Sequence, residues 1–129
     1  MIFRKLKFSL VPGDFAVCRL APDAPFPVWA SRSRIASVVR TADELSVVCP
    51  TEDIPPGATV DGPWACIKLE GPFPFDKTGV LASVLDPLAA AGISIFALST
   101  FDTDYVLVKA DQREGAIAAL VKAGHQLLS

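Results

Sequence analysis

The sequence predicts an α+β protein made of two related units, the first truncated and the second complete. Phe15–Leu20 (FAVCRL) is echoed by Trp64–Leu69 (WACIKL). In the same order, Thr41–Val48 (TADELSVV) returns in altered form as Thr100–Val108 (TFDTDYVLV). Two matched pairs in one order indicate that one supersecondary unit occurs twice. The gap between the paired segments is 21 positions in the first copy and 31 in the second, so the first copy lacks about one helix.

The second unit begins with a strand and a helix. Apolar and charged residues alternate over 65–70, which predicts a half-buried strand that ends at Gly71-Pro72. From Asp76 to Gly92 the apolar residues fall on one helical face, with Asp76 as the N-cap and Gly92 just past the end. Pro87 lies inside this helix, where it removes one backbone hydrogen bond and should cause a kink.

A hairpin and a second helix complete this unit. The hairpin comprises Ile93–Ser99, a turn at Phe101–Asp104 and Tyr105–Ala110. Asp111 and Glu114 have the spacing of a capping box, Gly124 ends the helix, and His125–Leu128 is expected to be a closing strand. The order β-α-β-β-α-β is the ferredoxin-like plan, in which two helices cover one face of an antiparallel sheet. We therefore expect a complete unit over residues 61–129.

The first unit, residues 1–60, keeps the strands and almost no helix. Its strands are predicted at Phe15–Leu20, Ile35–Arg40 and Glu44–Cys49, and Phe3–Leu10 is expected to add an edge strand. Prolines at 22, 25 and 27 leave room for a turn around Val28–Ser31, and the proline-rich stretch from Pro50 to Pro63 is expected to be a linker.

This stripped sheet predicts a homodimer. Its strands carry apolar residues such as Phe15, Val17, Val39 and Val47 on both faces, with no helix of their own to cover either face. Since 51% of the chain is hydrophobic, we expect the uncovered area to be buried against a second copy.

Composition excludes several classes of function. A net charge of −2 gives no electrostatic footprint for nucleic acid. The three cysteines form no CxxC and no metal-ligand spacing, which favours buried free thiols in a reducing cytoplasm. We expect no metal and no cofactor. There is no signal-type apolar region at the start, and no run of membrane-spanning length.

One pair of segments resembles a known family. Asp76–Leu81 (DKTGVL) followed by Pro87–Ile95 (PLAAAGISI) resembles the ACT domain, a small-molecule regulatory module of amino-acid metabolism. The family pattern is an acidic residue or Asn, then x-x-Gly-x-Leu, then a helix ending in Ala-Gly-Ile-x-Ile; Thr78 stands where Pro is usual. Leu98–Val108 is similar to tandem-ACT proteins related to the regulatory end of aspartate kinase and to animal cytosolic arginine sensors. The resemblance implies tandem ferredoxin-like ACT units and an amino-acid ligand.

The resemblance also implies a site where the loop after the first strand and the start of the first helix meet a neighbouring unit. Free N–H groups at a helix N-terminus attract a carboxylate, and here they would belong to Lys77, Thr78, Gly79 and Val80. Asp76, as an N-cap, would compete for the same donors.

Acidic residues in the hairpin turn are the second part of the expected site. Asp102 and Asp104, which flank Thr103, could accept hydrogen bonds from the ammonium group of an amino acid. Alternatively, the three residues satisfy backbone groups of the turn, as their types commonly do.

The leading hypothesis is therefore a non-catalytic, amino-acid-binding regulatory protein. The alternative is a structural dimerisation module whose ACT-like site is empty. An RNA-binding domain of the same strand and helix order would need exposed strand aromatics among Lys and Arg, which these strands lack. An enzyme is not expected, because no paired carboxylates, metal spacing or activated nucleophile occurs. His125, the only histidine, has no triad partner in a recognisable motif, and we expect a surface or strand position for it.

Overall fold

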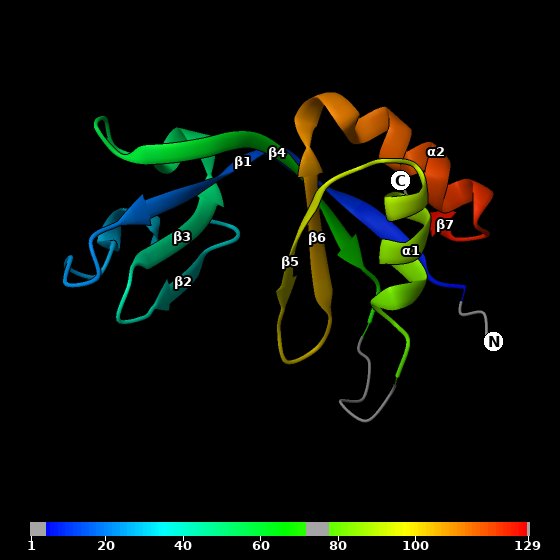
Figure 1. The fold of residues 1–129 in the computed structure, drawn as a ribbon, viewed down its shortest axis with the longest axis horizontal. Helices are drawn as coiled ribbons and strands as arrows, with labels where there is room; N and C mark the ends of the chain where they lie inside the picture. The colour runs from blue at the N-terminus through cyan, green and yellow to red at the C-terminus, as the bar shows by residue number, and fades with distance from the viewer. Residues whose placement is uncertain (1–4, 72–77, 129) are drawn as a thin grey trace. The chain divides into compact units, whose positions relative to one another are not determined.

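The computed structural model describes residues 5–71 and 78–128, and the chain forms two compact units (Figure 1). The C-terminal unit combines Ala65–Ser129 with Met1–Pro12, and the N-terminal unit is Gly13–Trp64. Two long strands, β1 (Lys7–Leu20) and β4 (Thr59–Leu69), each contribute residues to both units. The start of the chain is thus part of the C-terminal unit.

The C-terminal unit has the predicted β-α-β-β-α-β order. After β4 come α1 (Ala82–Ala90), β5 (Ile95–Ser99), β6 (Asp104–Lys109), the short 3-10 helix η3 (Ala110–Gln112), α2 (Arg113–Lys122) and β7 (Gln126–Leu127). Its strand order is β7-β1-β4-β6-β5, with β5 and β6 antiparallel and β7 parallel to β1. The ferredoxin-like α+β prediction is confirmed. Within the segment expected as an edge strand at Phe3–Leu10, residues 3 and 4 lie outside the described residues, and Lys7–Leu10 is the start of β1, which lies between β7 and β4.

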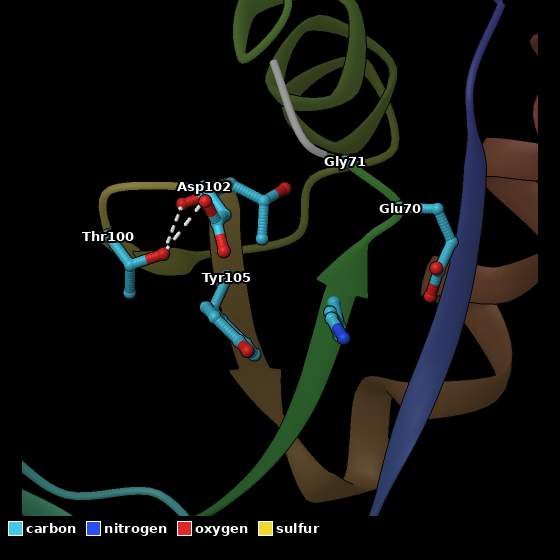
Figure 2. A pocket seen from close by; sticks show the side chains of 7 residues that line it. Glu70, Gly71, Thr100, Asp102 and Tyr105 are labelled. Atoms are coloured by element: carbon cyan, nitrogen blue, oxygen red, sulfur yellow. Dashed lines mark hydrogen bonds between the residues drawn. The ribbon is translucent and has the colours of Figure 1, made fainter. Parts of the chain in front are cut away.

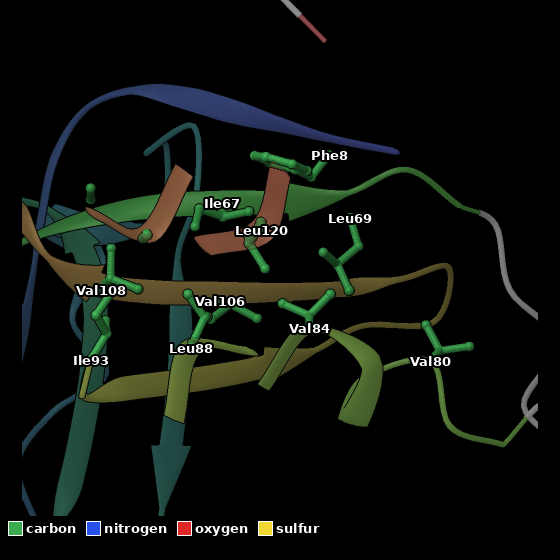
Figure 3. Close-up of a cluster of buried hydrophobic side chains, with 12 residues drawn as sticks. Phe8, Ile67, Leu69, Val80, Val84, Leu88, Ile93, Val106, Val108 and Leu120 are labelled. Atoms are coloured by element: carbon green, nitrogen blue, oxygen red, sulfur yellow. The ribbon is translucent and has the colours of Figure 1, made fainter. Parts of the chain in front are cut away.

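An apolar cluster forms the core of this unit (Figure 3). Alternate residues of β4 and β6 point into it, and both helices contribute their apolar faces, so α1 and α2 cover the same side of the sheet. Phe8 from β1 joins them and is only 1% exposed. The largest fully buried members from the other elements are Ile67, Leu69, Leu88 and Leu120. Each such side chain contributes roughly 1.5–3 kcal/mol by burial.

The two helices end as predicted and begin later than predicted. Gly92 and Gly124 have φ of +74° and +100°, the left-handed conformation that glycine adopts freely at a helix C-terminus. The N-cap of α1 is Leu81, so the expectation that Asp76 caps this helix is wrong. The capping box of Asp111 and Glu114 is also wrong, because α2 follows the 3-10 turn η3 and neither helix has a side-chain cap.

Pro87 lies inside α1, and the hydrogen bond it cannot donate is replaced from elsewhere. Its missing N–H would have bonded the carbonyl of Ser83, four residues earlier. That carbonyl instead accepts from Nε2–H of His125 at 2.7 Å. The other ring nitrogen, Nδ1, accepts the backbone N–H of Leu6 at 3.0 Å, which fixes the tautomer. His125 is 3% exposed and lies directly before β7, so it is a buried structural residue and not the surface or strand residue that the sequence predicted.

The N-terminal unit is a small sheet with short 3-10 turns. Its own elements are η1 (Val28–Ala30), β2 (Ser37–Arg40), β3 (Leu45–Pro50) and η2 (Thr51–Asp53). Strand β3 pairs antiparallel with both β2 and β1, in the order β2-β3-β1-β4. The predicted hairpin and the turn near Val28 are confirmed. The expected linker is shorter than predicted, because β4 begins at Thr59.

One face of this sheet is covered by the chain itself. Cys18, Val47 and Cys49 are completely buried, and Trp29 and Ile54 from the two turn segments pack against them. The expectation of an uncovered apolar sheet is therefore wrong. Of the four side chains on which the predicted dimer surface was based, Phe15 and Val47 are buried, Val17 is half-buried and only Val39, at 53%, is largely exposed. The homodimer itself stays a prediction.

Candidate functional site

A small cavity lies in the C-terminal unit, where β4 ends beside the β5–β6 turn (Figure 2). Its volume is about 190 Å³, less than a pocket for a drug-sized ligand. Figure 2 shows Thr100 and Asp102 on the turn, Tyr105 on β6 and Glu70 at the end of β4. The residues of the described chain that line the cavity are Lys68, Glu70, Gly71, Thr100, Asp102, Thr103 and Tyr105.

Charges of both signs reach this cavity without partners in the described part of the chain. The ammonium of Lys68 and the carboxylate of Asp102 form no ion pair and no hydrogen bond there, and neither does the Tyr105 hydroxyl. Glu70 is partly engaged, since its Oε1 accepts from the Ser9 hydroxyl at 3.1 Å. The cavity therefore offers one cation, one free carboxylate and one phenol to a small polar molecule.

The turn beside the cavity is held by its own threonines. The N–H of Thr100 donates to the carbonyl of Thr103 at 2.8 Å, and the Thr100 hydroxyl donates to the same carbonyl at 3.0 Å. The Thr103 hydroxyl is buried and donates to the carbonyl of Leu69 at 2.7 Å, which ties the turn to β4. These bonds fix the position of Asp102 between the two threonines.

The three predicted turn residues thus have different environments. Asp102 lines the cavity, and its carboxylate has no partner among the described residues. Thr103 lines it too, but its hydroxyl is committed to the backbone of β4. Asp104 is not among the lining residues and accepts from the Ser99 hydroxyl at 2.5 Å.

The predicted loop before α1 is only partly visible. Asp76 and Lys77 lie outside the described residues. Thr78 is exposed, Gly79 has φ of +77°, and the Val80 side chain is buried in the core. These three residues precede α1, which begins at Ala82, so their N–H groups are not the free donors of its first turn. None of the three is among the described residues that line the cavity.

Sequence reasoning missed five lining residues: Lys68, Glu70, Gly71, Thr100 and Tyr105. The signal for three of them was present. Side chains alternate between the two faces of a strand. Ile67 and Leu69 point into the core, so Lys68 and Glu70 lie on the opposite face of β4. Val106 also points into the core, so its neighbour Tyr105 lies on the opposite face of β6. What the sequence did not show is that β4 and β6 are neighbours.

The cysteines do not offer reactive thiols. Cys18, Cys49 and Cys66 are free and buried, as predicted. Burial raises the pKa of Cys66 to about 12, and burial together with Cys18 and the carboxylates of Asp53 and Glu52 raises that of Cys49 to about 11. Within residues 5–71 and 78–128, no cluster of His, Cys, Asp and Glu could hold a metal ion. The same residues include no helix long and apolar enough to cross a membrane.

Comparisons with known proteins agree with this architecture. The ACT domain family model matches residues 59–122, and a second model, described as an N-terminal domain, matches residues 13–57. The crystal structure of an Agrobacterium tumefaciens protein is 42% identical over 97% of this chain and 93% of that one, with a TM-score of 0.90. The regulatory subunit of aspartate kinase from Thermus flavus superposes with a TM-score of 0.67 at 13% identity, over 93% of this chain and 99% of that one, which shows the shared fold.

Among curated proteins, the human protein named cytosolic arginine sensor for mTORC1 subunit 1 is 37% identical over 67 residues. The match covers 51% of this chain and 20% of that protein, so the chain spans about a fifth of the curated relatives it matches. The matched family model, the shared fold and the sensor relatives together show that this chain is an ACT-domain protein.

Proposed function

We propose that this protein is a non-catalytic regulatory module that binds a free amino acid in the cavity beside the β5–β6 turn. One observation carries the proposal: the Lys68 ammonium and the Asp102 carboxylate, neither of which has a partner among residues 5–71 and 78–128, line the same small cavity. A free amino acid is a zwitterion, so its carboxylate complements Lys68 and its ammonium complements Asp102.

The remaining lining groups select for polarity and size. The Tyr105 hydroxyl and the second carboxylate oxygen of Glu70 can each bond a polar atom of the ligand. A volume of about 190 Å³ favours a single amino acid over a peptide or nucleotide. Arginine is the first candidate to test, because the human relative is named as an arginine sensor. The buried free thiols favour a cytoplasmic location.

Thermal unfolding in the presence of each protein amino acid tests this proposal. A ligand that binds only the folded state adds about 2.7 kcal/mol at a hundred times its dissociation constant, which raises Tm by roughly 5–10 °C at this chain length. We expect one amino acid, or a few related ones, to produce that shift. If none moves Tm at millimolar concentration, the alternative of a structural dimerisation module with an empty site replaces this proposal.

A further inference from the structure

The side chain of His125 joins segments of the C-terminal unit that lie far apart in the chain. Its Nδ1 accepts the N–H of Leu6 in the N-terminal segment at 3.0 Å, and its Nε2–H donates to the Ser83 carbonyl in α1 at 2.7 Å. The backbone next to the histidine completes this contact, because the N–H of Gln126 donates to the carbonyl of Leu6 at 2.9 Å. Residues 125 and 126 therefore hold both backbone groups of Leu6.

The contact with Leu6 requires a neutral ring. A neutral imidazole has one N–H donor and one acceptor nitrogen, whereas a protonated imidazole has two donors and no acceptor. Protonation of His125 would place an Nδ1–H against the N–H of Leu6, donor against donor. The bond from Nε2–H to Ser83 would remain. Of the two bonds, only the one to the N-terminal segment depends on the protonation state of the ring.

The surroundings of His125 offer no compensation for a positive charge. The residue is 3% exposed, and no carboxylate in residues 5–71 and 78–128 bonds to its ring. The Nζ of Lys5 lies 3.3 Å from the point that a Cβ on the neighbouring Gly124 would occupy. Glu70, whose N–H donates to the carbonyl of Lys7, has its carboxylate bonded to Ser9. The charged residues nearest along the chain to Leu6, Ser83 and His125 are all exposed: Lys5, Lys7, Asp86 and Lys122. A buried charge without a partner is costly, so these surroundings favour the neutral ring.

We propose that His125 is an acid-sensitive clamp on the N-terminal segment, and that protonation of its ring releases Leu6 and loosens the contact of β1 with β7. That contact is short, since β1 and β7 pair at Lys7–Gln126 and Phe8–Leu127. The clamp does not depend on amino-acid binding, because His125 is not among the described residues that line the cavity. His125 is the only histidine in the chain, and histidine is the side chain that ordinarily changes charge between pH 5 and 8.

The pH dependence of urea unfolding tests the clamp in the full chain. A histidine in an unfolded chain takes up its proton as the pH falls through about 6.5. When the folded state excludes that proton, the unfolded state binds one more, and the unfolding equilibrium constant rises by up to about tenfold per pH unit below that value. His125→Gln is the matched control, because glutamine offers an N–H and an oxygen but takes up no proton. Between pH 7.5 and 5.5, we expect the constant to rise up to about tenfold more in wild type than in His125→Gln.

Amide hydrogen exchange of the wild type locates the change. Protection, corrected for the intrinsic effect of pH, is expected to fall at Leu6, Gln126 and Leu128 before it falls at Ile67 in the core, because the first three N–H groups bond across this contact. An equal pH dependence of unfolding in wild type and His125→Gln would overturn the proposal. Protection at Leu6 that persists as the pH falls would also overturn it, and this measurement decides the question even if the glutamine variant does not fold.

Discussion

Replacement of His125 by leucine is expected to lower the free energy of unfolding by about 2–5 kcal/mol. The histidine ring bonds two part-buried backbone groups, the N–H of Leu6 and the carbonyl of Ser83. Leucine fills a similar volume and bonds neither. Each buried polar group left without a partner costs about 1–3 kcal/mol. Urea unfolding of wild type and variant measures the difference directly.

A second substitution measures the contribution of the His125–Ser83 bond separately from that of the His125–Leu6 bond. Pro87→Ala restores a helical N–H that can donate to the Ser83 carbonyl, which Pro87 leaves to His125. We therefore expect Pro87→Ala to stabilise the His125→Leu chain by about 1 kcal/mol more than it stabilises wild type, as a double-mutant cycle would show. Equal effects in both backgrounds would mean that His125 does not substitute for the missing proline N–H.

An effect of similar size is expected at Phe8, near the start of the chain. Phe8 is 1% exposed and packs in the core with residues of β4, α1 and α2. Phe8→Ala should cost about 3–5 kcal/mol, the range for removing a buried aromatic side chain. Phe26→Ala is the matched control, because Phe26 is 57% exposed and should change stability by no more than about 0.5 kcal/mol. If Phe8→Ala were as stable as the Phe26→Ala control, the N-terminal segment would not be part of the core.

The predictions that succeeded are those that depend on local patterns. The alternation of apolar and charged residues over 65–70 predicted β4, and the apolar face around Val84 and Leu88 predicted α1. The glycines at 92 and 124 predicted the ends of both helices. The helix starts were predicted wrongly for a physical reason. Asp76 and Asp111 have the right residue type for capping, but both helices begin without any side-chain cap, so residue type alone misplaces their first turns.

Contacts between residues that lie far apart in the chain could not be predicted from the sequence. His125 lies 119 positions from Leu6, and nothing local indicates that the two meet. The cavity is a similar case, since Lys68 and Asp102 come from separate segments that the pairing of β4 with β6 brings together. The sequence could single out the two acidic turn residues. Only the structure shows that Asp104 accepts a hydrogen bond from Ser99, whereas Asp102 lines the cavity and has no partner in the described part of the chain. The derivation of both units from one duplicated segment stays a prediction.

The central claim is that the cavity holds the amino acid, and titration calorimetry of four variants tests it. Lys68→Met and Asp102→Asn each remove one charge that lines the cavity, while Lys7→Met and Asp43→Asn make the same changes at exposed positions outside it. A hydrogen bond to a charged group contributes about 1.5–3 kcal/mol, so each cavity variant should weaken binding by about tenfold or more, and neither control should. Wild-type affinity in both cavity variants would contradict the account.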